Sequence, residues 1–275
     1  MKKVDRLGWA VGFSLTTYGI RVGVRSNDPS GLERICDRLP SEWKESSLSV
    51  VDRLYSIIIG GQGQRNFRRF NLLYGDHVRL ARSVEADDVF DTFESDLRLT
   101  VAEFARHRVF VHAGVVGWKG RAIIIPGRSY SGKSTLIAEL VRAGATYYSD
   151  EYAVFDSQGR VHPFKKALEL RSAGEVRQTR VEVEQLGGQS GEGPLPVQLV
   201  VVTQFKDGAR WRPRRLSGGP GILQLFSHTV SARRSPERAL TALQNLAQTA
   251  EFLRGPRGEA SEIARTILKR AEQKK

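Results

Sequence analysis

Residues 127–134 read Gly127-Arg128-Ser129-Tyr130-Ser131-Gly132-Lys133-Ser134 and match the pattern G-x-x-x-x-G-K-[ST] at every fixed position. In proteins this pattern forms a loop whose backbone N–H groups surround the phosphates of a nucleoside triphosphate. The lysine of such a loop reaches the β- and γ-phosphates, and the serine offers its hydroxyl to Mg²⁺. Thr135 follows directly and is placed to support the same phosphates. The sequence therefore predicts ATP and Mg²⁺ as cofactors, bound by Gly127 through Thr135.

The segments around this loop have the pattern that the motif requires. Ala122–Ile125 is a short apolar run typical of a buried strand, and Ser134–Val141 has apolar residues on one side of a helix. Val109–Val116, Thr146–Tyr148 and Val197–Phe205 are further apolar segments that predict strands. Strand, loop, helix and strand in succession indicate an α/β fold with the loop at the ends of sheet strands.

The rest of the C-terminal half is expected to contain one loop and two helices. Gly187–Pro194 has the composition of a mobile loop. Ser235 is a good helix cap before Pro236, and the apolar spacing predicts a helix that continues through Ala250. A last helix is expected over Glu259–Ala271.

The first hundred residues predict a separate, smaller α/β unit. Its helices are expected at Leu32–Arg38 and at Asp87–Arg106, whose first turn is acidic. Its strands are expected over Val11–Arg25, Ser47–Ile59 and Phe67–Leu80, with a turn at Gly60–Asn66. We therefore predict two domains, residues 1–107 and residues 108–275.

The composition narrows the class of partner. Lys and Arg number 43 against 30 Asp and Glu, a formal charge of +13, which favours anionic partners such as nucleotides or acidic proteins. No nucleic-acid-binding motif is present. The single cysteine, Cys36, excludes an internal disulfide framework. No apolar stretch reaches the roughly 18 residues that span a bilayer. We expect a cytoplasmic protein that does not associate with a membrane.

Asp150 and Glu151 follow the predicted strand Thr146–Tyr148, which places them in the ligand crevice beside the phosphate loop. Two adjacent acids there divide the work of holding a metal and accepting a proton. The alternative is a charged surface turn. Arg210–Arg215 is the densest basic cluster, and it is interpreted either as a solvated turn or as a site for a phosphate or an acidic substrate.

The segment from Val109 to Arg171 resembles the catalytic domain of HPr kinase/phosphorylase. The resemblance is carried by His112-Ala113-Gly114-Val115, the phosphate loop, Arg142-Ala143-Gly144, Ser149-Asp150-Glu151 and Leu168-Glu169-Leu170-Arg171. It implies the fold shared with phosphoenolpyruvate carboxykinases, preceded here by the smaller α/β domain, and it also favours a homo-oligomer. Glu151 stands in place of a second aspartate in the family, and Ser172 in place of a glycine.

The resemblance also implies roles for individual residues. Asp150 matches the catalytic acid that acts as base toward a substrate hydroxyl, and His112 matches a histidine near the reacting phosphate. Glu151 and Glu169, together with Ser134, match the metal side. The expected activity is an ATP- and Mg²⁺-dependent kinase that phosphorylates a hydroxyl on a protein, peptide or small molecule. The alternative is a nucleotide-binding regulatory or assembly module with little phosphotransfer. The acceptor and the reverse phosphorolysis reaction are left open.

Overall fold

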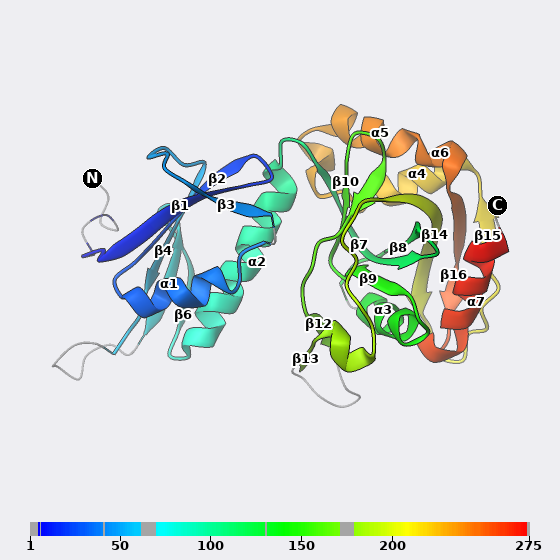
Figure 1. Ribbon diagram of the computed structural model, residues 1–275, viewed down its shortest axis with the longest axis horizontal. Helices are drawn as coiled ribbons and strands as arrows, with labels where there is room; N and C mark the ends of the chain where they lie inside the picture. The colour runs from blue at the N-terminus through cyan, green and yellow to red at the C-terminus, as the bar shows by residue number, and fades with distance from the viewer. Residues whose placement is uncertain are drawn as a thin grey trace. The chain divides into compact units, whose positions relative to one another are not determined.

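The computed structural model describes residues 5, 7–40, 42–61, 70–129, 131–170 and 179–273. The chain forms two compact units, Met1–His107 and Arg108–Lys275. Figure 1 shows the first in blue to cyan and the second in green to red. Each unit combines helices with a sheet, so the chain is a mixed α/β protein, as the sequence predicts.

The first unit is a six-stranded sheet with two helices on one face. The strand order is β3-β1-β2-β4-β5-β6, in which only β2 and β4 are parallel. The two helices lie side by side, because the Arg34 guanidinium of the first pairs with Asp87 and lies 4.1 Å from the Phe90 ring centre of the second. In chain order the elements are β1 (Val11–Thr17), β2 (Ile20–Ser26), α1 (Pro29–Cys36), β3 (Trp43–Ser46), β4 (Arg53–Ile58), β5 (Asn71–Gly75), β6 (Val78–Ser83) and α2 (Ala86–Phe104).

Two segments that the sequence predicts as single strands fold as hairpins. The chain turns at Tyr18-Gly19, where both residues have positive φ, 48° and 82°, so Val11–Arg25 divides into β1 and β2. This is the backbone of a two-residue hairpin turn. Within Phe67–Leu80, β5 and β6 meet at a turn where Asp76 also has positive φ. Residues 67–69 and most of the predicted turn Gly60–Asn66 lie outside the described residues.

The second unit is built on an eight-stranded sheet. Its order is β11-β10-β7-β8-β14-β16-β15, with β9 on β7 and a further pairing of β11 with the start of β14. Strands β8, β14 and β16 are parallel neighbours, so their carboxyl ends share one edge. In chain order the strands are β7 (Val109–Trp118), β8 (Arg121–Pro126), β9 (Thr146–Ser149), β10 (Tyr152–Phe155), β11 (Arg160–His162), β14 (Leu195–Phe205), β15 (Arg214–Leu216) and β16 (Glu251–Arg257).

Helices cover both faces of this sheet, each over its own apolar core. One face carries α3 (Lys133–Arg142) and α7 (Ala260–Gln273), and residues such as Leu136, Ile137 and Ile267 fill the core beneath them. The other face carries α4 (Gly218–Phe226), α5 (Pro236–Gln244) and α6 (Leu246–Thr249), packed on residues such as Phe155 and Phe252. Figure 1 shows these two helical layers on either side of the strands. A separate ribbon of β12 (Leu168–Leu170) and β13 (Thr179–Val181) completes the unit, with the short 3-10 helices η2 (Val183–Leu186) and η3 (Val230–Arg233).

The C-terminal part differs most from the prediction. The single helix expected to continue through Ala250 is divided into α5 and α6, which ends at Thr249. A partly buried strand, β16, follows between β14 and β15. The sequence does not predict β16, because it contains Gly255 and Pro256, which are typical of turns rather than strands. Within the described part of the chain, no helix has the length and apolar character that crossing a membrane would require.

Candidate functional site

The phosphate-loop motif lies between the end of β8 and the start of α3, at the edge where the parallel strands end. Two of its glycines are required by close contacts. A Cβ on Gly132 would lie 2.5 Å from the Arg257 guanidinium, and its φ of 83° is a conformation that other residues rarely adopt. A Cβ on Gly127 would lie 2.6 Å from Ser131 Oγ. The sequence therefore bends the chain closely around the N-terminus of α3. Tyr130 lies outside the described residues.

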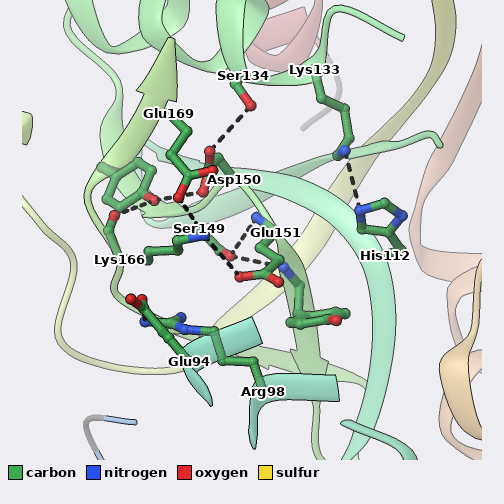
Figure 2. A network of polar contacts seen from close by, with 12 residues as sticks. Glu94, Arg98, His112, Lys133, Ser134, Ser149, Asp150, Glu151, Lys166 and Glu169 are labelled. Atoms are coloured by element: carbon green, nitrogen blue, oxygen red, sulfur yellow. Dashed lines mark hydrogen bonds and ion pairs between the residues drawn. The ribbon is translucent and has the colours of Figure 1, made fainter. Parts of the chain in front are cut away.

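Lys133 begins α3 and contacts a histidine on the neighbouring strand. Its side chain is 8% exposed, and Nζ lies 3.4 Å from His112 Nε2 (Figure 2). Burial lowers the pKa of Lys133, which Asp150 and Glu151 partly restore. Burial, together with the nearby Lys133 and His228, lowers the pKa of His112 to about 4. His112 is therefore neutral at pH 7, and its Nε2 can accept a hydrogen bond from Lys133.

His112 also holds the beginning of the loop through its backbone. Its carbonyl accepts a hydrogen bond from Gly127 N at 3.3 Å, and its N–H donates to His228 O at 2.8 Å. The main chain of β7 thus connects the phosphate loop to the segment before η3. Burial also lowers the pKa of His228, with Arg128 and Lys133 adding to the shift. His228, which was not selected in the sequence analysis, is therefore a neighbour of the loop's cations.

Asp150 stands next to Ser134 directly after β9. Ser134 Oγ donates to Asp150 Oδ2 at 3.1 Å, and the Tyr147 hydroxyl donates to Oδ1 at 3.3 Å. The turn is shaped by Ser149, whose Oγ accepts from the backbone N–H groups of Glu151 and Tyr152. Burial raises the pKa of Asp150, while Lys166 and the bond from Ser134 oppose the rise. A buried carboxylate of this kind is a stronger base than an exposed one.

Lys166 joins the two remaining acids of the predicted metal side. Its Nζ lies 3.0 Å from Glu169 Oε1 and 3.6 Å from Glu151 Oε2, and its side chain is 17% exposed (Figure 2). Glu169 reaches this position from β12, whereas Glu151 follows β9. Sequence analysis missed Lys166, although it precedes the matched Glu169 by three residues. Arg171, the last residue of that matched segment, lies outside the described residues.

These groups face one pocket of about 390 Å³, within the size range of small-ligand sites. Of the predicted site residues, the pocket does not include Gly127, Arg128 or Ser131 in its lining. The lining residues are His112, Ser129, Gly132, Lys133, Ser134, Thr135, Asp150, Glu151, Lys166 and Glu169. The fold therefore brings the loop, the histidine and all three predicted acids together.

No protein-family model matches this chain, and a search of curated proteins finds no match. A solved structure is similar. It is the Hpr(Ser) kinase/phosphatase from Coxiella burnetii, with 13% sequence identity and a TM-score of 0.33. The similarity covers 60% of this chain and 97% of that chain.

The oxygen atoms that face the pocket can be compared with those that hold Mg²⁺ beside a nucleotide. Among the described residues, no group of three or more His, Cys, Asp or Glu side chains is arranged to hold a metal ion. Ser134, Glu151 and Glu169 offer one hydroxyl and two carboxylates to the pocket, which suits Mg²⁺ that is bound also through phosphates and water. Ser131 Oγ is buried and has no hydrogen-bond partner within the described part of the chain.

Arg257 supports the loop from the opposite side and was not predicted to have a role. This last residue of β16 is 2% exposed, and it donates to Gly132 O at 2.7 Å and to Gly258 O at 2.8 Å. Burial lowers the pKa of Arg257, so keeping its guanidinium charged costs free energy of desolvation. Arg257 was missed because it lies on β16, whose Gly255 and Pro256 are not typical of a strand.

The basic cluster Arg210–Arg215 is partly strand rather than only a turn. Arg214 and Arg215 belong to β15, the edge strand, and Arg214 lies opposite Arg254 of β16. Arg215 Nε lies 3.7 Å from Glu251 Oε1, beside the shorter ion pair of Arg270 with the same carboxylate. None of these arginines lines the pocket at the phosphate loop.

Proposed function

We propose that this protein is an ATP- and Mg²⁺-dependent kinase of the HPr-kinase-like type, which transfers the γ-phosphoryl group to a hydroxyl. The observation that carries the proposal is one pocket that joins Lys133 of a complete phosphate-loop motif to the buried carboxylate of Asp150. The proposal includes the fold shared by HPr kinases and phosphoenolpyruvate carboxykinases for residues 108–275.

The phosphate loop binds the nucleotide in this proposal. Its backbone N–H groups and the N-terminus of α3 face the phosphates, and Lys133 binds the β- and γ-phosphates in place of its contact with His112. The lowered pKa of Lys133 reflects a charge that lacks water, so anionic oxygens are favourable partners for it. His112 is neutral at pH 7, so it releases Lys133 to the phosphates without leaving a second cation beside it.

Transfer requires an acceptor hydroxyl between the γ-phosphate and Asp150. The acceptor oxygen forms a bond to the γ-phosphorus, the bond from that phosphorus to the bridging oxygen breaks, and ADP leaves. The hydroxyl proton passes to Asp150, whose raised pKa suits a general base. Mg²⁺, when bound, neutralises charge on the phosphate oxygens, with Ser134, Glu151 and Glu169 on its side of the site. Most of the catalytic effect is then positioning and charge neutralisation.

The experiment is transfer of label from [γ-³²P]ATP to components of a cell extract, followed by identification of the labelled product. We expect label in a hydroxyl-bearing acceptor with the natural chain and a large loss with Asp150→Asn. ATP that is bound tightly while no component gains label, and while none is consumed, would instead favour the nucleotide-binding regulatory module. A chain that binds no ATP would overturn both functions.

A further inference from the structure

The order of the strands in the sheet indicates which way a nucleotide bound at the loop extends. The groups that suit the γ-phosphate, His112 and Asp150, come from β7 and from the end of β9, on one side of β8. The other neighbour of β8 is β14, followed by β16. A triphosphate with its reactive end toward β7 and β9 therefore extends its nucleoside toward the carboxyl ends of β14 and β16. This step depends on the proposed function.

An exposed aromatic residue occupies that end of β14. Phe205 is the last residue of the strand and is 42% exposed. It also contacts the loop: its N–H donates to Ser131 O at 3.3 Å, and its Cβ lies 3.5 Å from where a Cβ on Gly132 would be. Neither apolar core of the unit includes Phe205. The ring therefore contributes little to the packing of the fold, although it lies next to the phosphate loop.

The position of Phe205 is fixed from two sides. Its backbone is bound to the loop through Ser131, and the next residue, Lys206, donates its N–H to Arg257 O at 2.9 Å. The buried Arg257 guanidinium lies 5.7 Å from the ring centre, within cation–π range, and the same guanidinium binds Gly132 O. A ring held in this way can stack on a planar ligand with little further loss of side-chain freedom.

We propose that Phe205 is the stacking surface for the base of a nucleoside triphosphate bound at the phosphate loop. Stacking of a base on an aromatic side chain contributes about 1–3 kcal/mol, so the base should tighten binding by about 5- to 150-fold. Every base has a flat π-face, so Phe205 gives affinity for a base without selecting adenine over guanine.

The test compares ATP with inorganic tripolyphosphate, which has the same phosphate chain and no base, by calorimetric titration in Mg²⁺. The wild-type protein should bind ATP about fivefold or more tightly than tripolyphosphate. Phe205→Ala should remove most of this difference and leave tripolyphosphate binding unchanged, whereas Phe205→Trp should preserve it. Leu240→Ala, which changes a side chain that is 41% exposed on α5, is the matched control and should alter neither ligand.

Three results would overturn the inference. Equal weakening of ATP and tripolyphosphate by Phe205→Ala would assign Phe205 to the shape of the loop. An unchanged preference for ATP in that variant would place the base elsewhere. A natural chain that binds neither compound would overturn the proposed function and the inference together. Should Phe205→Ala fail to fold, Phe205→Leu keeps an apolar contact with the loop but no stacking ring, and the same comparison decides.

Discussion

Replacing Lys133 with methionine separates ligand binding from folding, because the lysine charge is buried and its aliphatic stem is retained. The pKa of Lys133 is lowered by burial, so its protonated form is less favourable in the folded chain than in the unfolded chain. Wherever Lys133 is protonated in the folded chain, its buried charge therefore costs stability. We expect Lys133→Met to leave the melting temperature without ligand unchanged or to raise it.

The effect on ATP is expected to be large. A charge-assisted hydrogen bond contributes about 1.5–3 kcal/mol, and Lys133 makes two in the proposed complex, so affinity should fall about a hundredfold or more. At ATP equal to 100 times the Kd of the natural chain, binding stabilises by about 2.7 kcal/mol, and at the same concentration the variant gains only about 0.4 kcal/mol. For a unit of this size, each kcal/mol shifts the melting temperature by about 2–4 °C.

The assay is a thermal-shift titration with Mg²⁺ and ATP. ATP should raise the melting temperature of the wild-type protein by about 5–11 °C and that of the variant by about 1–2 °C. Lys119→Met is the matched control, because Lys119 is an exposed lysine that pairs with Glu272 at 2.8 Å and does not line the pocket. An ATP-induced shift in Lys133→Met equal to that of the control would refute the assignment of the loop to phosphates.

The other predictions test single groups of the pocket. Asp150→Asn keeps the shape but accepts no proton, so phosphotransfer should fall about 10²- to 10⁴-fold in a radiolabel assay while calorimetry shows ATP binding retained; unfolding of this variant would make Asp150 a structural residue. Lys166→Met removes a cation 3.0 Å from Glu169, so the Mg²⁺ concentration needed for half-maximal activity should fall and direct Mn²⁺ binding should tighten. A higher Mg²⁺ requirement or weaker Mn²⁺ binding would assign Lys166 to phosphate binding. The pKa of His112 is about 4 in the folded chain, against an ordinary value of 6.5. The contribution of neutral His112 to stability is therefore complete above pH 6.5 and is lost as the pH falls toward 4. The free energy of unfolding should fall by at most about 1.4 kcal/mol per pH unit over this range. His112→Gln should flatten the loss seen in urea unfolding over that range, and parallel curves for the two chains would contradict it.

The sequence was most informative where local chemistry determines structure. The phosphate loop depends on glycine spacing and on the apolar strand and helix beside it, and these are visible within about twenty residues. The long helix α2 begins one residue before the predicted Asp87 and ends two before Arg106, because its apolar spacing and acidic first turn are both strong. The placement of Asp150 at the pocket followed from the rule that strand ends beside such a loop form a crevice.

The missed residues depend on contacts between distant parts of the chain. Arg257 lies on a strand with glycine and proline, and only its pairing with β14 shows that it ends beside the loop. Lys166 lies in an irregular segment, so no periodicity predicts that it contacts Glu151, which comes from a different element. The first hairpin was missed because Tyr18 adopts positive φ, which tyrosine rarely does. The second was missed although Gly75-Asp76 is typical of a hairpin turn.

The bond between Arg257 and Gly132 joins residues that are 125 positions apart. A chain emerging from the ribosome exposes its phosphate loop long before the strand that supports it has been synthesised. Contacts of such separation form late and slow the folding of a domain. The loop therefore reaches its final shape only when translation of this unit is nearly complete, and premature termination before β16 would yield a chain that carries the entire motif without its support.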